Sequence, residues 1–256
     1  IKLNGKIERA NFQISPEIKS KFISNQLKEV YFSDLEIFTE FKPKKIDIKS
    51  MGKYSFNNIE QDDNSISETF ILSAGSDYFK NEVNCNLNGE YSSAFINGVF
   101  SLKENQQHEI RSTINHLVEN TKSYQLIKSV LGKNSKSAYQ GRIYVDSKAQ
   151  KTDGYQLSKA ILLDETSEFN AKPELEIYAD DVKCSHGSAS GSLNENSIFY
   201  LMSRGLNYQQ SKELLINGFL LDVVEKITDS EIRNLVKNII GLKAVSYTHL
   251  TLPTTR

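Results

Sequence analysis

Hydrophobic and polar residues alternate in many short segments between about residue 45 and residue 184. The segments are rich in β-branched and aromatic residues, and Gly, Asn, Asp and Ser separate them. A period of two in such residues is typical of strands that bury one face. The predicted strands include residues 54–56, 69–72, 83–87, 94–100, 110–114, 124–127, 141–145 and 175–179.

Many short strands at near-regular spacing are compatible with a sandwich, a barrel or a β-helix. Two-residue hairpin signals are few, and Asn88-Gly89 is one candidate. A solenoid in which each coil buries one inward row of side chains tolerates a pattern without a strict repeat. The pattern therefore predicts a mainly β fold, with a β-helix placed slightly ahead of a sandwich.

After Gly191 the hydrophobic period becomes helical, and three short helices are predicted. Asn194 is the expected N-cap of the first, which carries Ile198, Leu201 and Met202 and ends at Gly205. Asn207 is the expected N-cap of the second, with Gln210 completing a capping box. Its predicted apolar stripe consists of Leu215, Phe219, Val223 and Ile227. A Thr-x-x-Glu box from Thr228 to Glu231 starts the third, and Gly241 ends it.

These differences in hydrophobic periodicity divide the chain into four parts. Residues 1–45 mix a strand pattern with a helical one, in which Pro16 occupies the first turn of a helix. We expect the β-helix core over residues 46–191 and the helical domain over residues 192–243. Residues 244–256 lack caps and do not continue the apolar stripe, so we interpret them as a non-native tail.

Charge and composition exclude several classes of protein. The chain has 31 basic and 32 acidic residues, without the concentrated basic charge of a nucleic-acid binder. No apolar run approaches the ~20 residues that span a bilayer, so no membrane association is expected. Two cysteines and a polar start without a signal peptide predict a reducing, cytoplasmic location.

The densest cluster of chemically active residues lies between residues 173 and 187. If this segment is one extended strand, Asp180, Val182, Cys184 and His186 share a face. A thiolate and an imidazole two residues apart can bind one soft or borderline metal ion, but they supply only two ligands. A partner protein would have to supply the rest. The competing interpretation is that a lone cysteine is a small buried hydrophobe.

The remaining thiol and two of the other histidines are interpreted as structural. Cys85 lies between two asparagines in a predicted strand and is expected in the core. His108 and His116 have no thiol nearby, and each is expected to be a satisfied hydrogen-bonding group.

Motifs of common enzymes are missing. No phosphate-binding loop is found, so no ATP site is expected in this chain. No nucleophile elbow and no zinc-protease helix occur either. The acidic pairs at 62–63 and 180–181 are adjacent, so on a strand their side chains would point to opposite faces. The chain is therefore not expected to be an enzyme.

Several segments resemble the SufB/SufD family of iron–sulfur cluster assembly proteins, in its SufD-type form. They are EIYADDVKCSHG at 176–187, IFYLMSRGL at 198–206, AQKTDGYQ at 149–156 and YQGRI at 139–143. The resemblance covers about residues 46–240. Two departures are Met202, where the family usually has Arg, and a short N-terminal side, which leaves the completeness of the β-helix open.

The resemblance implies a right-handed parallel β-helix followed by a C-terminal helical domain. It implies pairing with SufB, or with a second copy, through the β-helix, and binding of the ATPase SufC through the helices. Cys184 and His186 would contact a transient iron–sulfur cluster or iron shared with SufB. The residues expected to bind a partner are Ile198, Phe199, Tyr200, Leu201, Arg204 and Phe219.

Two alternatives stay open. One is a secreted-type β-helix enzyme acting on carbohydrates, which needs acidic residues that converge on a groove. The other is a purely structural partner of SufB without cluster contact.

Overall fold

The computed structural model describes residues 2–3, 10–14 and 53–242, with side chains from residue 56 onward. The predicted N-terminal helix after Pro16, the first residues of the expected β-helix at 46–52 and the tail at 244–256 lie outside the described residues.

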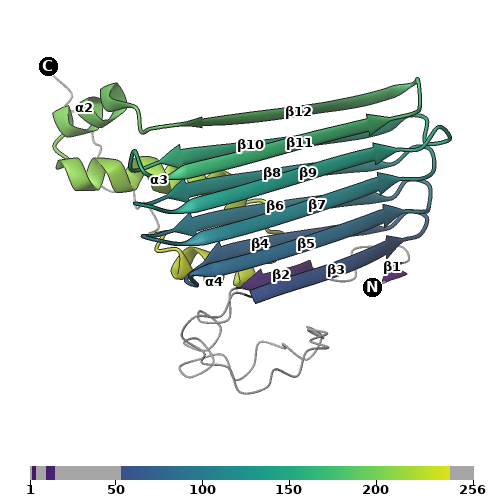
Figure 1. The fold of residues 1–256 in the computed structure, drawn as a ribbon, viewed down its shortest axis with the longest axis horizontal. Coiled ribbons are helices and arrows are strands. Elements are labelled where there is room, and N and C mark those ends of the chain that lie inside the picture. Colours follow the sequence, from purple (N-terminus) through teal and green to yellow (C-terminus); the bar gives the residue numbers. More distant parts are fainter. Residues whose placement is uncertain (1, 4–9, 15–52, 243–256) are drawn as a thin grey trace, which may run out of the picture.

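Twelve strands form two six-stranded sheets, and successive strands alternate between them (Figure 1). Sheet A contains β1 (Lys2–Leu3), β3 (Lys53–Gln61), β5 (Tyr78–Leu87), β7 (Gln107–His116), β9 (Lys136–Val145) and β11 (Glu168–Ile177). Sheet B contains β2 (Ala10–Ile14), β4 (Ile66–Ala74), β6 (Ser93–Leu102), β8 (Lys122–Leu131), β10 (Thr152–Leu162) and β12 (Val182–Gly191).

Every pairing within the two sheets is parallel. A chain that alternates between two parallel sheets winds as a solenoid, so the predicted β-helix is confirmed over the sandwich. Strands β1 and β2 pair with β3 and β4, so residues before 46 also contribute to the stack. The hairpin suggested at Asn88-Gly89 is wrong, because this turn carries the chain from β5 in one sheet to β6 in the other.

Between β3 and β12, the separation between paired residues in neighbouring coils ranges from 26 to 32 residues and is 29 in the middle of the stack. Twenty-nine residues separate Phe79 from its partner His108, and another 29 separate His108 from Ser137. The turns between sheets use the left-handed backbone conformation, mostly at asparagine: Asn64, Tyr91, Asn105, Asn120, Asn134 and Lys151 have φ between 53° and 59°. Asparagine tolerates this conformation better than most residues, which explains its recurrence at turn-like positions in the sequence.

The inside of the solenoid is filled by alternate residues of both sheets. Its main cluster joins side chains such as Ile71, Phe100, Ile114 and Tyr139, all 2% exposed or less. Polar groups are also buried inside, and many of them are hydrogen-bonded to one another. Gln61, for example, accepts hydrogen bonds from the Ser67 hydroxyl and the Cys85 thiol.

Three helices follow the last strand: α2 (Glu195–Ser203), α3 (Tyr208–Val224) and α4 (Ser230–Ile239). The caps at Asn194 and Asn207, the box with Gln210, and the positive φ of Gly205 and Gly241 confirm the predicted boundaries. No helix in the described part of the chain has both the length and the apolar character needed to cross a membrane.

Two details of the helices differ from the prediction. Asp229, rather than Thr228, caps α4, because its carboxylate accepts the backbone N–H groups of Glu231 and Ile232. The Thr228 hydroxyl instead donates to Glu68 on β4. Ile227 lies beyond the end of α3, although it is still buried.

Helices α3 and α4 pack on the outer face of sheet B. Their apolar residues Leu220, Val223 and Val236 form one cluster with Leu72 and Leu126 from the strands. In Figure 1 the three helices gather at one end of the strands, with α2 beside β12 and α4 near β2 and β4. Among the described residues, the helices therefore cover the outer face of sheet B, and no strand pairs with the outer edge of the last coil.

Candidate functional site

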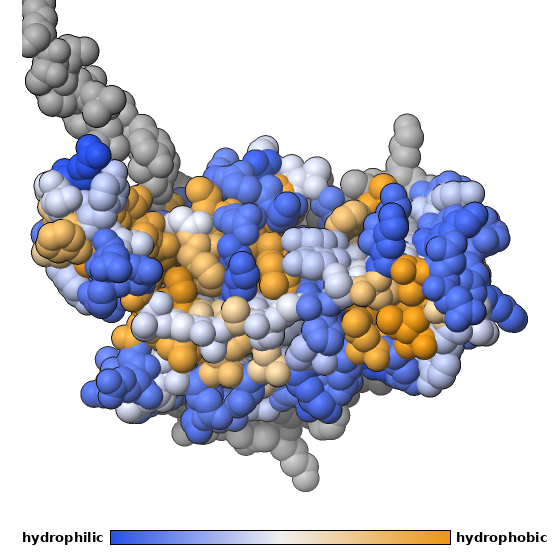
Figure 2. Space-filling model, turned by 90° about the horizontal axis from the view of Figure 1, so that it is seen from above, coloured by the Kyte–Doolittle hydropathy of each residue, from blue (hydrophilic) through white to orange (hydrophobic). Residues whose placement is uncertain are grey.

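The last coil is an open end of the stack. Strand β11 is the edge of sheet A and β12 is the edge of sheet B, so each has one strand neighbour in the described chain. An edge strand presents unpaired N–H and C=O groups that can pair with another chain. Figure 2, which looks at the molecule from above, shows apolar patches among polar ones on this side. This end is suited to contact with another protein.

The expectation of one extended strand over residues 173–187 is wrong. Strand β11 ends at Ile177, and residues 178–181 turn the chain into sheet B, where β12 begins. Asp180 therefore does not belong to the same strand as Cys184 and His186. The predicted alternation does hold within β12, because Cys184 and His186 lie opposite Gly154 and Gln156 of β10.

The turn before β12 is held by the preceding coil. The backbone N–H of Lys151 donates to the carbonyl of Asp181 over 2.6 Å, and the Gln150 side chain accepts the N–H of Asp181 over 2.9 Å. Lys151 itself has a φ of 58°. The AQKTDGYQ segment thus fixes where β12 begins, and with it the position of the Cys-x-His pair.

Cys184 faces the inside of the solenoid and is half-buried. It packs at the edge of a small cluster formed by Ile143, Val145, Ala149 and Ala179. Loss of water around the thiol raises the pKa of Cys184, while a backbone hydrogen bond with Gly154 acts in the opposite direction. The thiol is therefore sheltered, yet it lies where the stack opens.

Gly154 leaves room beside that thiol. A Cβ added to this glycine would lie 3.3 Å from the Cys184 Sγ and 3.4 Å from the Ile143 side chain. Sequence reasoning did not identify Gly154 or Gln156 as neighbours of the site. The signal that locates them is the coil length, since each lies 30 residues before its partner on β12.

His186 is exposed, and Gln156 beside it is 1% exposed. The two predicted ligands thus differ in environment, a sheltered thiol next to an imidazole that solvent or a partner can reach. Among the described residues, no group of three or more His, Cys, Asp and Glu side chains can hold a metal ion. Any iron bound at Cys184 and His186 would need ligands from elsewhere.

The other thiol lies inside the solenoid. Cys85 is fully buried, and burial raises its pKa to about 12. Such a thiol stays protonated and packs as a hydrophobe, as expected from the sequence.

His108 and His116 also lie inside the solenoid. His108 contacts the Ser73 hydroxyl and the carbonyl of Ser76, each over 2.7 Å. His116 contacts the hydroxyls of Thr121 and Ser123. Burial lowers the pKa of both, to about 3 for His116. Both histidines are neutral members of the core, which agrees with their structural interpretation.

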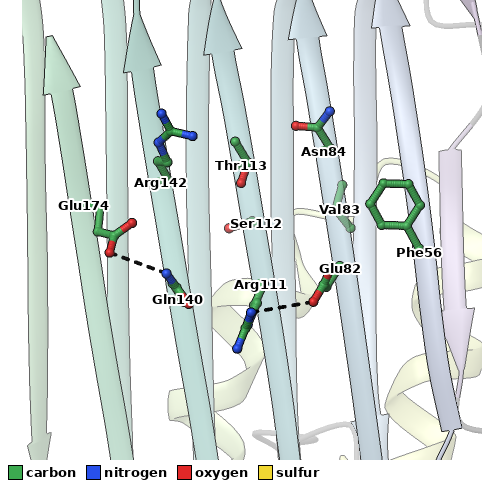
Figure 3. Close-up of a pocket in the computed structure, with 10 residues that line it drawn as sticks. All are labelled: Phe56, Glu82, Val83, Asn84, Arg111, Ser112, Thr113, Gln140, Arg142 and Glu174. Atoms are coloured by element: carbon green, nitrogen blue, oxygen red, sulfur yellow. Dashed lines mark hydrogen bonds and ion pairs between the residues drawn. The ribbon is translucent and has the colours of Figure 1, made fainter.

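A groove of about 380 Å³ lies on the outer face of sheet A (Figure 3). Its acidic side chains are paired: Glu82 lies 3.9 Å from Arg111, and Glu174 contacts Lys172 and Gln140. The ion pair with Lys172 lowers the pKa of Glu174, whereas a general acid needs a raised pKa. Glu174 is therefore unsuited to the role of general acid in a glycosidase.

Helix α2 presents a separate apolar surface. Phe199 is 74% and Tyr200 is 55% exposed, and the Arg204 guanidinium lies 5.2 Å from the Tyr200 ring centroid. Two other predicted partner-binding residues are not free, because Ile198 is 2% exposed and Phe219 packs against sheet B. Leu201 is partly buried. We define the α2 surface as Phe199, Tyr200, Met202, Arg204 and Tyr208, all exposed.

The sequence of the chain is similar to those of known proteins. A family profile described as SUF system FeS cluster assembly, SufBD core domain, matches residues 45–219. The chain is 33% identical over 183 residues to the iron–sulfur cluster assembly protein SufD of Escherichia coli, covering 72% of this chain and 43% of that protein. It is 39% identical over 117 residues to the chloroplastic protein ABCI7 of Arabidopsis thaliana, covering 45% of this chain and 25% of that protein.

A third relative is an iron–sulfur cluster assembly SufBD family protein of Synechocystis. The chain is 32% identical to it over 121 residues, which cover 47% of this chain and 27% of that protein. The chain spans less than half the length of each of these relatives.

Proposed function

The chain belongs to the SufB/SufD family of iron–sulfur cluster assembly proteins and is SufD-like, and on this premise we propose that it is a scaffold subunit that pairs with SufB and is coupled to the ATPase SufC. In this role it is not an enzyme, and it works in the cytoplasm. Iron and sulfide are its cargo, held briefly at a boundary between two proteins.

The observation that carries the proposal is the position of Cys184 and His186. Both lie on the edge strand β12 at the open end of the stack, facing the inside of the solenoid. A second solenoid stacked on this end would cover the bare strand edges and bring its own side chains next to the thiol and the imidazole. A site built from two ligands of this chain and further ligands of a partner would lie at the boundary between the two solenoids.

The two side chains contribute different chemistry. A cysteine binds iron as the thiolate, which is the usual protein ligand of iron–sulfur clusters, and imidazole can replace it. Burial favours the protonated thiol of Cys184, so a cation arriving next to it would favour release of the proton. His186 needs no rearrangement to be reached, because it is exposed.

SufC would bind the helical region. The α2 surface supports this assignment, since aromatic residues and Arg are enriched at the centres of protein interfaces. Phe199 and Tyr200 are the strongest candidates as anchors, while Ile198 and Phe219 hold the helices in place. The resulting arrangement places the ATPase beside the helices and SufB at the open end.

The test is cluster formation in a complex reconstituted with SufB and SufC. We expect His186→Ala to abolish cluster formation while the complex still assembles, because the substitution removes an exposed side chain and leaves the fold intact. The matched control is Ser185→Ala, the neighbouring residue on the opposite face of β12. Normal iron and sulfide content in His186→Ala would contradict the site assignment.

A comparison of iron binding separates this proposal from a purely structural partnership. With SufB present, Cys184→Ala is expected to bind less iron than the unmodified chain under anaerobic conditions. Equal iron binding by the two proteins would favour the structural role.

A further inference from the structure

One buried lysine holds the helices on the solenoid. Lys128 projects from the outer face of β8 beneath α3, and its side chain is only 7% exposed. Lysine is almost never this buried unless its ammonium group is paired. Its neighbours on the same face of β8, Leu126 and Val130, belong to the apolar cluster that packs against the helices. The charge therefore lies inside an apolar contact.

Three contacts with α3 compensate for this burial. The Lys128 Nζ lies 2.7 Å from the Asp222 Oδ2, and it donates a hydrogen bond of 2.7 Å to the backbone carbonyl of Phe219. It also lies 4.6 Å from the centroid of the Phe219 ring. The hydrogen bond from Lys128 lowers the pKa of Asp222, so the carboxylate stays charged.

These contacts select one position of the helix. The surrounding residues Leu220, Val223 and Val224 are apolar and buried, and such a surface tolerates small sliding or rotation. A buried ammonium group does not, because any shift that removes one of its partners leaves a charge without compensation. A single buried polar residue is known to fix register in packed helices for this reason.

We propose that Lys128 is a positioning residue that fixes α3 in one register on sheet B and transmits a load on the helices into the strands. The second part rests on the proposed function, since the load would come from the ATPase bound at α2. The path is short: β8 pairs with β10, and β10 pairs with β12, which carries Cys184 and His186. In this arrangement α3 moves together with the solenoid and does not swing against it.

The first test uses the isolated chain and needs no partner. We expect Lys128→Met, which keeps the aliphatic stem, to increase amide hydrogen exchange in α3 at least tenfold. The matched control is Lys159→Met, an exposed lysine on β10 that also acts electrostatically on Asp222. That control is expected to exchange like the unmodified chain.

Substitutions of Asp222, the partner of Lys128, distinguish loss of the ion pair from a general folding defect of the Lys128 variant. Asp222 is 60% exposed, so it can be changed with little effect on packing. Asp222→Asn is expected to increase exchange in α3, and Asp222→Glu is expected to restore protection because it restores the charge. Unchanged exchange in both Lys128→Met and Asp222→Asn would overturn the register assignment.

The second test measures transmission in the complex with SufB and SufC. We expect ATP to change hydrogen exchange in β12 of the unmodified chain and not of Lys128→Met, while SufC still co-purifies with both. An equal response in the two proteins would overturn the transmission step. Failure of the unmodified chain to bind SufC would instead count against the proposed function and leave the result on the isolated chain standing.

Discussion

At the scale of single residues, the solenoid keeps ionisable groups neutral by removing water from them. His116 is fully buried, and its two ring nitrogens contact the hydroxyls of Thr121 and Ser123. Neither hydroxyl carries a charge that could stabilise an imidazolium ion. The result is a pKa of about 3, compared with an ordinary value of 6.5.

This depressed pKa makes the fold sensitive to acid. Between pH 6.5 and 3, this histidine is protonated in the unfolded chain and neutral in the folded chain. The free energy of unfolding therefore falls as pH falls. The contribution of His116 is complete above pH 6.5 and amounts to several kcal/mol, on the order of 1.4 kcal/mol per pH unit. We expect His116→Gln to flatten this dependence in urea denaturation between pH 4 and 6.5. Parallel curves for the two proteins would contradict this origin of acid sensitivity.

The environment of a residue could be predicted from the sequence where the alternation of apolar and polar residues along its own strand determines that environment. Cys85 sits in an alternating strand, so its burial was predicted from the pattern alone, whereas His116 was predicted only to be a hydrogen-bonded structural residue. The surroundings of Cys184 could not be predicted in this way, because Gly154 and Ile143 lie in other coils. The turn at residues 178–181 was also missed, since its hydrogen bonds come from Gln150 and Lys151 one coil earlier.

At the scale of elements, two glycines show how differently the backbone is constrained in a turn of the solenoid and in a surface helix. Gly89 lies between β5 and β6, and a Cβ added to it would lie 1.9 Å from the backbone nitrogen of Asp63. Gly218 is the opposite case, because it is exposed in the middle of α3 and a Cβ there meets no atom within 4 Å.

Alanine at these two glycines is expected to change stability in opposite directions. Gly89→Ala forces two backbones apart and should lower the free energy of unfolding by about 3 kcal/mol or more. Gly218→Ala should raise it by about 1 kcal/mol, since alanine is the better helix former. Urea denaturation of both variants measures the difference. A stable Gly89→Ala protein would show that the turn can move aside.

Helix boundaries were predicted well because caps are local. Asn207 and Gln210 lie three residues apart and form the expected box. The exception, Asp229 in place of Thr228, arises because a distant residue, Glu68, accepts the threonine hydroxyl. Strand β10 was not among the predicted strands, because its Thr152-Asp153-Gly154 start resembles a turn. Burial of Gly154 against β12 explains why glycine is found there.

At the scale of the whole molecule, the helices cover the outer face of one sheet, and within residues 53–242 no strand covers the end of the stack at β11 and β12. The edges of β11 and β12 are free to pair with another chain, and the inner side chains of β12 would be enclosed by it. Ser188 faces inward, where its hydroxyl bonds that of Ser158, while Ser185 projects from the opposite face.

The isolated chain is therefore expected to self-associate through this end in the absence of its proposed partner SufB. Ser188→Arg should abolish association, because it places a charge between the stacked coils, and Ser185→Arg should not. Sedimentation equilibrium over a range of concentrations measures the effect. Equal association of the two variants would mean that the chains meet through a different surface.

The equal length of the coils in the middle of the stack has a consequence for how such a protein can change over time. Because partners in neighbouring coils of the middle of the stack are 29 residues apart, gain or loss of one such unit leaves every remaining pair aligned. The number of coils between the two ends of the solenoid can thus change by whole coils. Proteins of this fold with different total lengths can then keep the same last coil and the same side chains on its final strand.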